Sequence, residues 1–82
     1  MGLKDTTELM NSEDYKERFK AEYYQLKIRT DKLHYIVNDY YDGDLKFELS
    51  CPIDLLEAQL NAMDVYLYLL EQRAKIENIN LN

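Results

Sequence analysis

Basic and tyrosine side chains gather in the first half of the chain, where they could bind an anionic ligand that carries planar rings. Between positions 16 and 32 three acidic residues stand against six basic ones, which are Lys16, Arg18, Lys20, Lys27, Arg29 and Lys32. On a helix, Tyr15 and Arg29 lie beside the apolar seam, with Arg18 and Lys32 at its margin. Arginine suits bidentate phosphate binding, and tyrosine suits stacking on nucleobases. Two interpretations follow: Arg29 pairs with Glu22, or oligomerisation gathers such side chains into anion pockets.

The other reactive side chains do not form a catalytic or metal-binding constellation. The single histidine, His34, has no cysteine or paired carboxylate at ligand spacing, so we interpret it as a polar residue at the edge of the first long helix. Cys51 precedes Pro52 and is interpreted as a helix cap, with a nucleophile as the alternative. The two glycines are isolated, so there is no glycine-rich phosphate loop. We therefore expect neither an enzyme nor a bound cofactor or metal.

Glycine and proline are scarce, so the breaks between predicted helices are easy to place. An Asp-Gly-Asp and a Cys-Pro sequence separate two long antiparallel helices, at about 12–41 and about 52–77, with a connector at about 42–51. A short helix at about 7–10 precedes them. The sequence therefore predicts an all-α protein with a single helical domain.

Local signals predict how these helices begin and what the irregular segments do. Ser12 suits the N-cap of the first long helix, and Pro52 suits the first position of the second. Phe47 is expected to pack the connector onto the bundle. The tail over 77–82 is expected to fray.

Both long helices carry apolar residues at seven-residue spacing, which is typical of helices packed along one seam. The repeats are Phe19, Leu26, Leu33 and Tyr40 on the first helix and Leu60, Leu67 and Ala74 on the second. The second helix has a further apolar row on another side, formed by Leu55, Ala58, Ala62, Val65, Leu69 and Ile76. A two-helix hairpin would leave that row in water as a large exposed patch. We therefore expect the protomers to be interlocked in a homo-oligomer.

Composition and net charge limit the kinds of partner that this chain is expected to bind. The 82 residues fit one small domain, and the net charge of −6 leaves no overall electrostatic footprint for duplex nucleic acid. No apolar stretch approaches the roughly 20 residues of a membrane helix, and the N-terminus lacks a signal-peptide pattern. One cysteine is typical of a cytosolic chain. We expect neither a membrane nor a duplex nucleic acid as partner.

A longer pattern joins these features: Tyr-x-x-Arg, a glutamate, leucines at seven-residue spacing, then Leu-Leu, Gln, Met, Tyr, Leu and a closing Arg. In this chain its carriers are Tyr15, Arg18, Glu22, Leu26, Leu33, Leu55, Leu56, Gln59, Met63, Tyr66, Leu70 and Arg73. The pattern, over roughly 12–76, resembles a family of small phage proteins common in gut-bacterial and crAss-like phages. That family includes the anti-CBASS sponges, which sequester cyclic oligonucleotide signals of bacterial immune systems.

The resemblance implies an interlocked homohexamer of helical protomers that binds without catalysis in the cytoplasm of the bacterial host. It implies cyclic dinucleotides held between protomers and cyclic trinucleotides held in separate pockets around the symmetry axis. Tyr15 matches the tyrosine that contacts the cyclic dinucleotide, and the basic residue of that pocket falls near Arg29 or Lys32. Arg73 matches the closing arginine used for trinucleotide phosphates, with Lys16 nearby.

Two alternatives stay open. Relatives of similar build could hold another nucleotide signal, such as an ADP-ribose product of TIR enzymes. In a different functional class, the chain could be a structural adaptor oligomer whose basic half-helix binds an acidic protein partner. Arg29 separates these possibilities, because it would contact a ligand in a sponge and support assembly in an adaptor.

Overall fold

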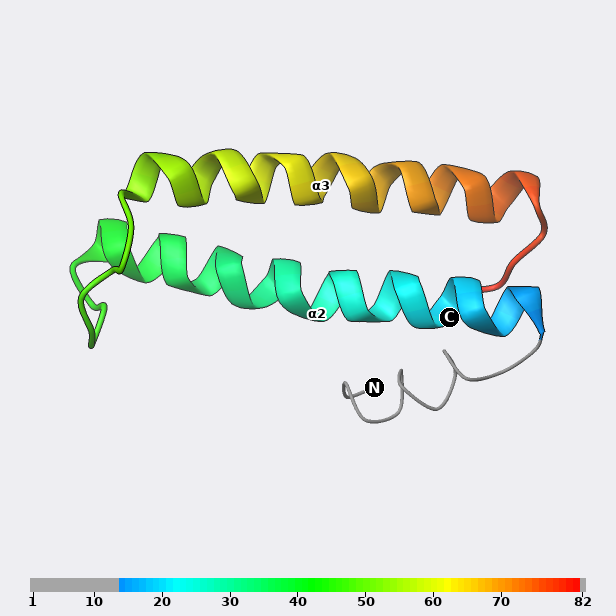
Figure 1. Cartoon of the computed structure of the whole chain (residues 1–82), viewed down its shortest axis with the longest axis horizontal. Helices are drawn as coiled ribbons and strands as arrows, with labels where there is room; N and C mark the ends of the chain where they lie inside the picture. Colours follow the sequence, from blue (N-terminus) through cyan, green and yellow to red (C-terminus); the bar gives the residue numbers. More distant parts are fainter. Residues whose placement is uncertain (1–13, 82) are drawn as a thin grey trace.

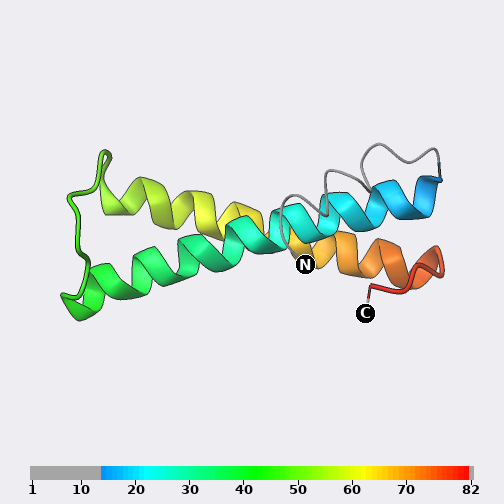
Figure 2. The same ribbon diagram turned by 90° about the horizontal axis from the view of Figure 1, so that it is seen from below.

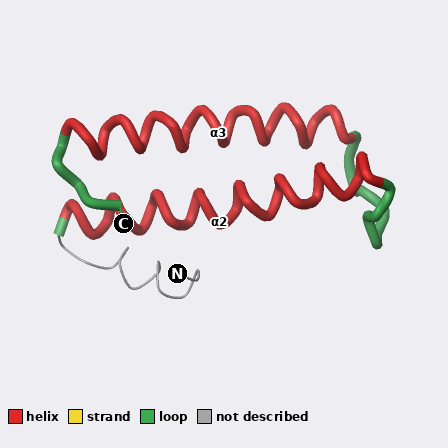
Figure 3. Tube along the Cα trace, turned by 180° about the vertical axis from the view of Figure 1, so that it is seen from behind, coloured by secondary structure: helices red, strands yellow, loops and turns green. Residues whose placement is uncertain are grey.

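The computed structural model describes residues 14–81, which fold as an antiparallel pair of helices, α2 (Tyr15–Asp42) and α3 (Ile53–Ile76) (Figure 1). The helices lie side by side along their length and cross near their middles in the view of Figure 2. After α3 the chain turns back towards the start of α2 (Figure 3). The described part contains helices and no strand, so the all-α prediction is confirmed there. The predicted helix at about 7–10 lies outside the described residues.

The start of α2 is fixed by a side-chain cap. The carboxylate of Asp14 accepts hydrogen bonds from the backbone N–H groups of Lys16, at 2.7 Å, and Glu17, at 3.2 Å. These bonds satisfy two of the amides that a helix leaves unpaired at its first turn. Ser12, which was predicted as the cap, lies outside the described residues.

Backbone geometry determines where α2 ends and where α3 begins. Gly43 ends α2 in the left-handed region with φ of 77°, and the next residue, Asp44, donates its N–H to the carbonyl of Asp39 at 2.9 Å. This six-residue closure is a Schellman turn, which glycine enters without steric cost. Pro52 precedes α3 as its N-cap and is not its first residue as predicted. Its carbonyl accepts the N–H of Leu55 at 3.1 Å.

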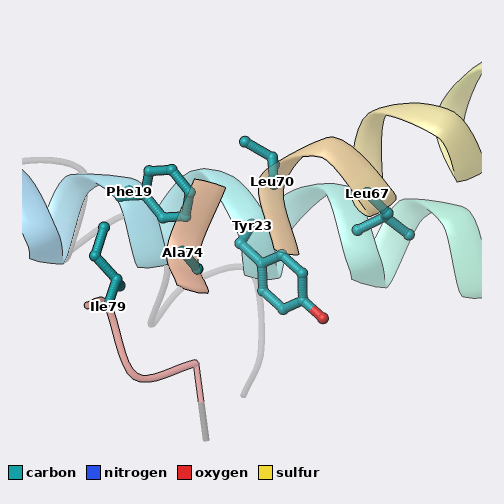
Figure 4. Packing of buried hydrophobic residues seen from close by; sticks show 6 residues of the cluster. All are labelled: Phe19, Tyr23, Leu67, Leu70, Ala74 and Ile79. Carbon is teal, nitrogen blue, oxygen red and sulfur yellow. The ribbon is translucent and has the colours of Figure 1, made fainter. Parts of the chain in front are cut away.

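The core is a seam between the helices in two parts. The larger cluster lies at the end where α2 begins and α3 ends, and consists of Phe19, Tyr23, Leu67, Leu70, Ala74 and Ile79 (Figure 4). The smaller cluster, nearer the connector, consists of Leu33, Val37 and Leu60. The predicted seven-residue row on α2 does not hold throughout, because Tyr40 is exposed. A straight helix drifts away from a strict seven-residue repeat, and the buried face of α2 follows that drift.

Large apolar side chains stay in water on this chain. The outer row of α3 is exposed, as predicted for a single hairpin: Leu55, Val65, Leu69 and Ile76 all have more than half of their surface accessible. The prediction that Phe47 packs onto the bundle is wrong, since 57% of its surface is exposed. The connector projects past the helix ends, where no other described element covers it (Figure 1). Neither α2 nor α3 is long and apolar enough to cross a membrane.

Candidate functional site

Three side chains from opposite ends of the sequence meet where α2 begins and α3 ends. Nη2 of Arg73 donates a hydrogen bond to the phenol oxygen of Tyr15 at 2.8 Å. The Tyr15 hydroxyl donates to Oε1 of Glu77 at 2.7 Å, and Nε of Arg73 donates to Oε2 of the same carboxylate at 3.2 Å. We call this closed arrangement the Tyr15–Arg73–Glu77 network.

An aromatic floor supports the network. The guanidinium carbon of Arg73 lies 5.0 Å from the ring centroid of Phe19, which is within the range of a cation–π contact. The rings of Tyr15 and Phe19 are 6.3 Å apart and inclined by 56°. Phe19 is only 3% exposed and belongs to the larger core cluster, so the floor is rigidly placed. A polar network therefore sits directly on the hydrophobic seam.

Beside the network the surface is hollowed. A recess of about 310 Å³ is lined by Tyr15, Arg18, Phe19, Glu22 and Arg73. It combines two guanidinium groups with two aromatic rings, which is the chemistry that binds phosphate and stacks on a planar base. The recess is open, so a second chain or a large ligand can reach it.

The backbone after α3 holds Glu77 in position. Glu77 donates its N–H to the carbonyl of Arg73 at 2.9 Å, and Ile79 donates to the carbonyl of Ala74 at 2.8 Å. Between them Asn78 has a φ of 58°, a left-handed conformation that asparagine tolerates. The side chain of Ile79 is 6% exposed and packs in the core, so this turn is anchored.

The expectation that residues 77–82 fray is therefore wrong for the described part of that tail. The hydroxyl of Tyr24 donates to the carbonyl of Leu81, and Nζ of Lys16 donates to the carbonyl of Asn78 at 3.5 Å. No periodic apolar pattern marks this segment in the sequence, because Ile79 packs through a turn and not through a helix face. Lys16 thus lies beside the network, where its side chain contacts the backbone of Asn78.

The network is charged at neutral pH. The hydrogen bond from Tyr15 lowers the pKa of Glu77 below its usual value, while the bond to Glu77 raises the pKa of the Tyr15 phenol. The bond to Glu77 also raises the pKa of Arg73. Glu77 is therefore a carboxylate, Arg73 a cation and Tyr15 a neutral phenol. The site carries one positive and one negative group in direct contact.

Glu22 has a different partner from the one that helical spacing suggested. The hydroxyl of Tyr66, on α3, donates to the carboxylate of Glu22, and this bond raises the pKa of the Tyr66 phenol. Within residues 14–81 no hydrogen bond or ion pair engages the guanidinium of Arg29. The interpretation that Arg29 pairs with Glu22 is thus wrong for the described chain.

Arg29 and Lys32 belong to a second recess. It measures about 300 Å³, and its other lining residues are Leu33, Ile36, Gln59 and Met63. Arg29 is fourteen residues after Tyr15, which corresponds to about 21 Å along α2. The predicted site residues therefore form two groups on one chain, with Tyr15, Lys16, Arg18 and Arg73 at one end and Arg29 and Lys32 towards the middle.

Two participants in the first group were not identified from the sequence. Phe19 was assigned only to the core, although its ring also supports Arg73. Glu77 was assigned to the tail, although its four-residue spacing from Arg73 is a recognisable signal for an ion pair on a helix. No spacing rule connects either residue to Tyr15, which approaches from the other helix.

The remaining reactive residues stay apart from these recesses. His34 lies at the exposed edge of α2, as predicted, and its Nε2 is 3.1 Å from Oδ1 of Asp64 on α3. Cys51 is half-buried in the connector, where it lines an apolar hollow of about 380 Å³ with Phe47 and other residues. Among residues 14–81 no group of histidine, cysteine and carboxylate side chains could hold a metal ion.

Comparison with models of known protein families identifies a match. The family model described as Sequestin matches residues 13–76, a span that contains α2, the connector and α3. Searches of curated proteins and of solved structures gave no significant match. The family name denotes sequestration, which agrees with the resemblance to sequestering proteins. Because the match covers well over half of the 82 residues and both long helices, the chain belongs to the Sequestin family.

Proposed function

We propose that this protein is a phage immune-evasion protein that binds and sequesters cyclic oligonucleotide second messengers of bacterial anti-phage signalling, without catalysis. It acts in the cytoplasm of the bacterial host as a homohexamer. Membership of the Sequestin family supports the sequestering role. The choice of ligand is based on the position of Arg73. Its guanidinium is hydrogen-bonded to Tyr15 and lies over the ring of Phe19, beside an open recess.

The chemistry of that recess suits a cyclic oligonucleotide. Such a ligand is a compact ring of riboses and phosphodiesters from which planar bases project. A guanidinium binds a phosphate through two parallel N–H groups, and an aromatic face stacks on a base with no sequence requirement. Arg73 and Tyr15 present both functions within 2.8 Å of each other.

The second recess supports a site shared between chains. A cyclic dinucleotide is too small to bridge the distance of about 21 Å between Tyr15 and Arg29 on one helix. A pocket that uses Tyr15 with Arg29 or Lys32 therefore takes them from different protomers. The exposed apolar row of α3 provides a surface on which protomers can assemble.

Sequestration requires tight binding and no reaction. A nanomolar pocket corresponds to about 12 kcal/mol of binding free energy, which phosphate pairing and base stacking in a shared cleft can supply. Among the described residues, neither recess is lined by a serine, threonine, cysteine or histidine side chain. The ligand is therefore expected to leave the protein chemically unchanged.

Isothermal titration calorimetry against cyclic dinucleotides, cyclic trinucleotides and ADP-ribose derivatives tests the proposal. We expect tight binding of at least one cyclic oligonucleotide, and mass spectrometry of the ligand released on denaturation should show it intact. Absence of heat with every cyclic oligonucleotide at micromolar protein would overturn the proposed ligand. Heat with an ADP-ribose derivative alone would assign the alternative signal, and a cleaved ligand would contradict binding without catalysis.

A further inference from the structure

We propose that Glu77 is a built-in competitor for the anion site of Arg73, and that an anionic ligand must displace its carboxylate to bind there. In this role Glu77 determines specificity, because a neutral or weakly bound ligand cannot displace it. The role rests on the proposed function in one respect, that Arg73 is a ligand-binding residue. It gives Glu77, which bonds directly to Arg73, a role that opposes anion binding at that side chain.

The carboxylate of Glu77 and the hydroxyl of Tyr15 together occupy the two positions on Arg73 that the oxygens of a bidentate phosphate would take. Its Oε2 accepts from Nε of Arg73 at 3.2 Å, and its Oε1 accepts from the hydroxyl of Tyr15 at 2.7 Å. Nη2 of Arg73 is bonded to the same Tyr15 hydroxyl at 2.8 Å. The edge of the guanidinium that carries Nε and Nη2 is therefore occupied within the chain. A phosphate that binds this edge bidentately must replace Glu77 at Nε and the Tyr15 hydroxyl at Nη2.

Glu77 is able to move aside without unfolding its surroundings. Its backbone is fixed by the bond to the carbonyl of Arg73 and by the buried Ile79 two residues later. Its side chain, in contrast, is 32% exposed and can rotate into water. Displacement therefore exchanges one solvated carboxylate for one bound phosphate and leaves the helix end intact.

A purely structural role makes a different prediction. An exposed Arg–Glu pair at four-residue spacing stabilises a helix end slightly, and removing it would lower stability without changing anion affinity. The participation of Tyr15 argues for more than an end cap, because Tyr15 belongs to the other helix and lines the recess. The two roles are separated by measuring affinity and stability on the same variant.

The test compares the wild-type chain with Glu77→Gln and with Glu71→Gln as a control. Glu71 lies on the same helix and accepts a hydrogen bond from the hydroxyl of Tyr23 at 3.1 Å, but it does not line the first recess. Both variants change the net charge by the same amount and both remove a Tyr–carboxylate pair. Any difference between them therefore reports the position of the carboxylate and not the overall charge.

The probe is inorganic pyrophosphate, titrated while the NMR signal of the Arg73 side-chain Nε–H group is followed. Arg73→Lys identifies that signal by its loss. We expect Glu77→Gln to bind pyrophosphate about three- to fivefold more tightly than wild type, with Glu71→Gln close to wild type. Equal affinity of wild type and Glu77→Gln would overturn the competitor role. A signal that no protein shifts at millimolar pyrophosphate would overturn it as well.

Calorimetry of the same three proteins with cyclic dinucleotides and trinucleotides separates this role from the proposed function. Tighter pyrophosphate binding by Glu77→Gln, with no cyclic oligonucleotide bound by any protein, would leave the competitor role standing and reject the proposed ligand. A cyclic oligonucleotide bound by wild type, with no gain for either probe in Glu77→Gln, would leave the proposed ligand standing and reject the competitor role.

Discussion

The phenol oxygen of Tyr15 accepts a hydrogen bond from Nη2 of Arg73 at 2.8 Å, although the two residues are 58 positions apart in the chain. This contact joins the first residue of α2 to the last turn of α3. It places a phenol ring and a guanidinium group side by side above the buried ring of Phe19. The contact exists because the hairpin brings the beginning of one helix to the end of the other.

Replacing Arg73 is expected to weaken ligand binding more than replacing another cation of α3. Loss of charged hydrogen bonds in Arg73→Ala should reduce affinity for the cyclic oligonucleotide by about 10- to 100-fold. Arg73→Lys should lose less, because it keeps the charge but not the planar, bidentate geometry. Calorimetry gives the affinities. Lys75→Ala is the matched control, since Lys75 is exposed on the same helix and should leave affinity within about twofold.

Arg29→Ala distinguishes a sponge from an adaptor. In a sponge, Arg29 contacts a ligand that is shared between chains. Its removal should then lower the affinity for a cyclic dinucleotide about tenfold or more and leave the oligomer intact. Light scattering coupled to size-exclusion chromatography measures the oligomer, and calorimetry measures the affinity. Lys27→Ala is the control, because Lys27 is already paired with Asp31 at 3.7 Å. Loss of the oligomer with unchanged ligand affinity would favour the adaptor.

Leu69 and Leu70 are neighbours in sequence with opposite environments, 56% and 1% exposed. Leu70→Ala leaves a cavity in the core cluster that contains Phe19 and should lower the free energy of unfolding by about 2–5 kcal/mol. Leu69→Ala should cost less than about 0.5 kcal/mol in a lone hairpin, but should weaken self-association if the outer row of α3 joins protomers. Urea unfolding and light scattering at several protein concentrations check both. Unchanged assembly in Leu69→Ala would argue against that row as an interface.

Alkaline pH is expected to destabilise the hairpin through its tyrosines. Burial and the hydrogen bond to Glu71 raise the pKa of Tyr23 from 10.0 to about 12. The hydrogen bond to Glu57 raises the pKa of Tyr41 to about 12 as well. Because these pKa values are raised by folding, the stabilisation is complete below the unfolded value near 10 and is lost as pH rises towards about 12.

Urea unfolding at neutral pH and at increasing alkaline pH measures this loss, and tyrosinate absorbance follows the titration. Tyr23→Phe removes the titrating group beside Glu71 and should flatten part of the dependence. Tyr35→Phe is the control, because Tyr35 is 72% exposed on α2. An identical alkaline profile in wild type and Tyr23→Phe would contradict the assignment to Tyr23.

The helices and the positions where they end are local properties of the chain, so both could be predicted from the sequence. Gly43 adopts the left-handed conformation that ends α2, and the apolar row containing Leu69 is exposed as its spacing implied. Both follow from residue types and from the helical period, which act over a few neighbouring positions. The concentration of basic residues on α2 can likewise be read directly from their positions in the sequence.

The partners across the seam were decided by the tertiary structure. Helical spacing offered Arg29 as the partner of Glu22, but the hydroxyl of Tyr66 takes that position from the facing helix. Likewise Tyr15 meets Arg73 and Glu77 because the packing of the core clusters fixes how far α3 slides along α2. A one-turn slip would shift every cross-helix pair by about 5 Å, more than a hydrogen bond can span. The sequence by itself determined two amphipathic helices with basic, acidic and tyrosine side chains at their edges. Which of these side chains meet depends on the register between α2 and α3, and only the packing of the core sets that register.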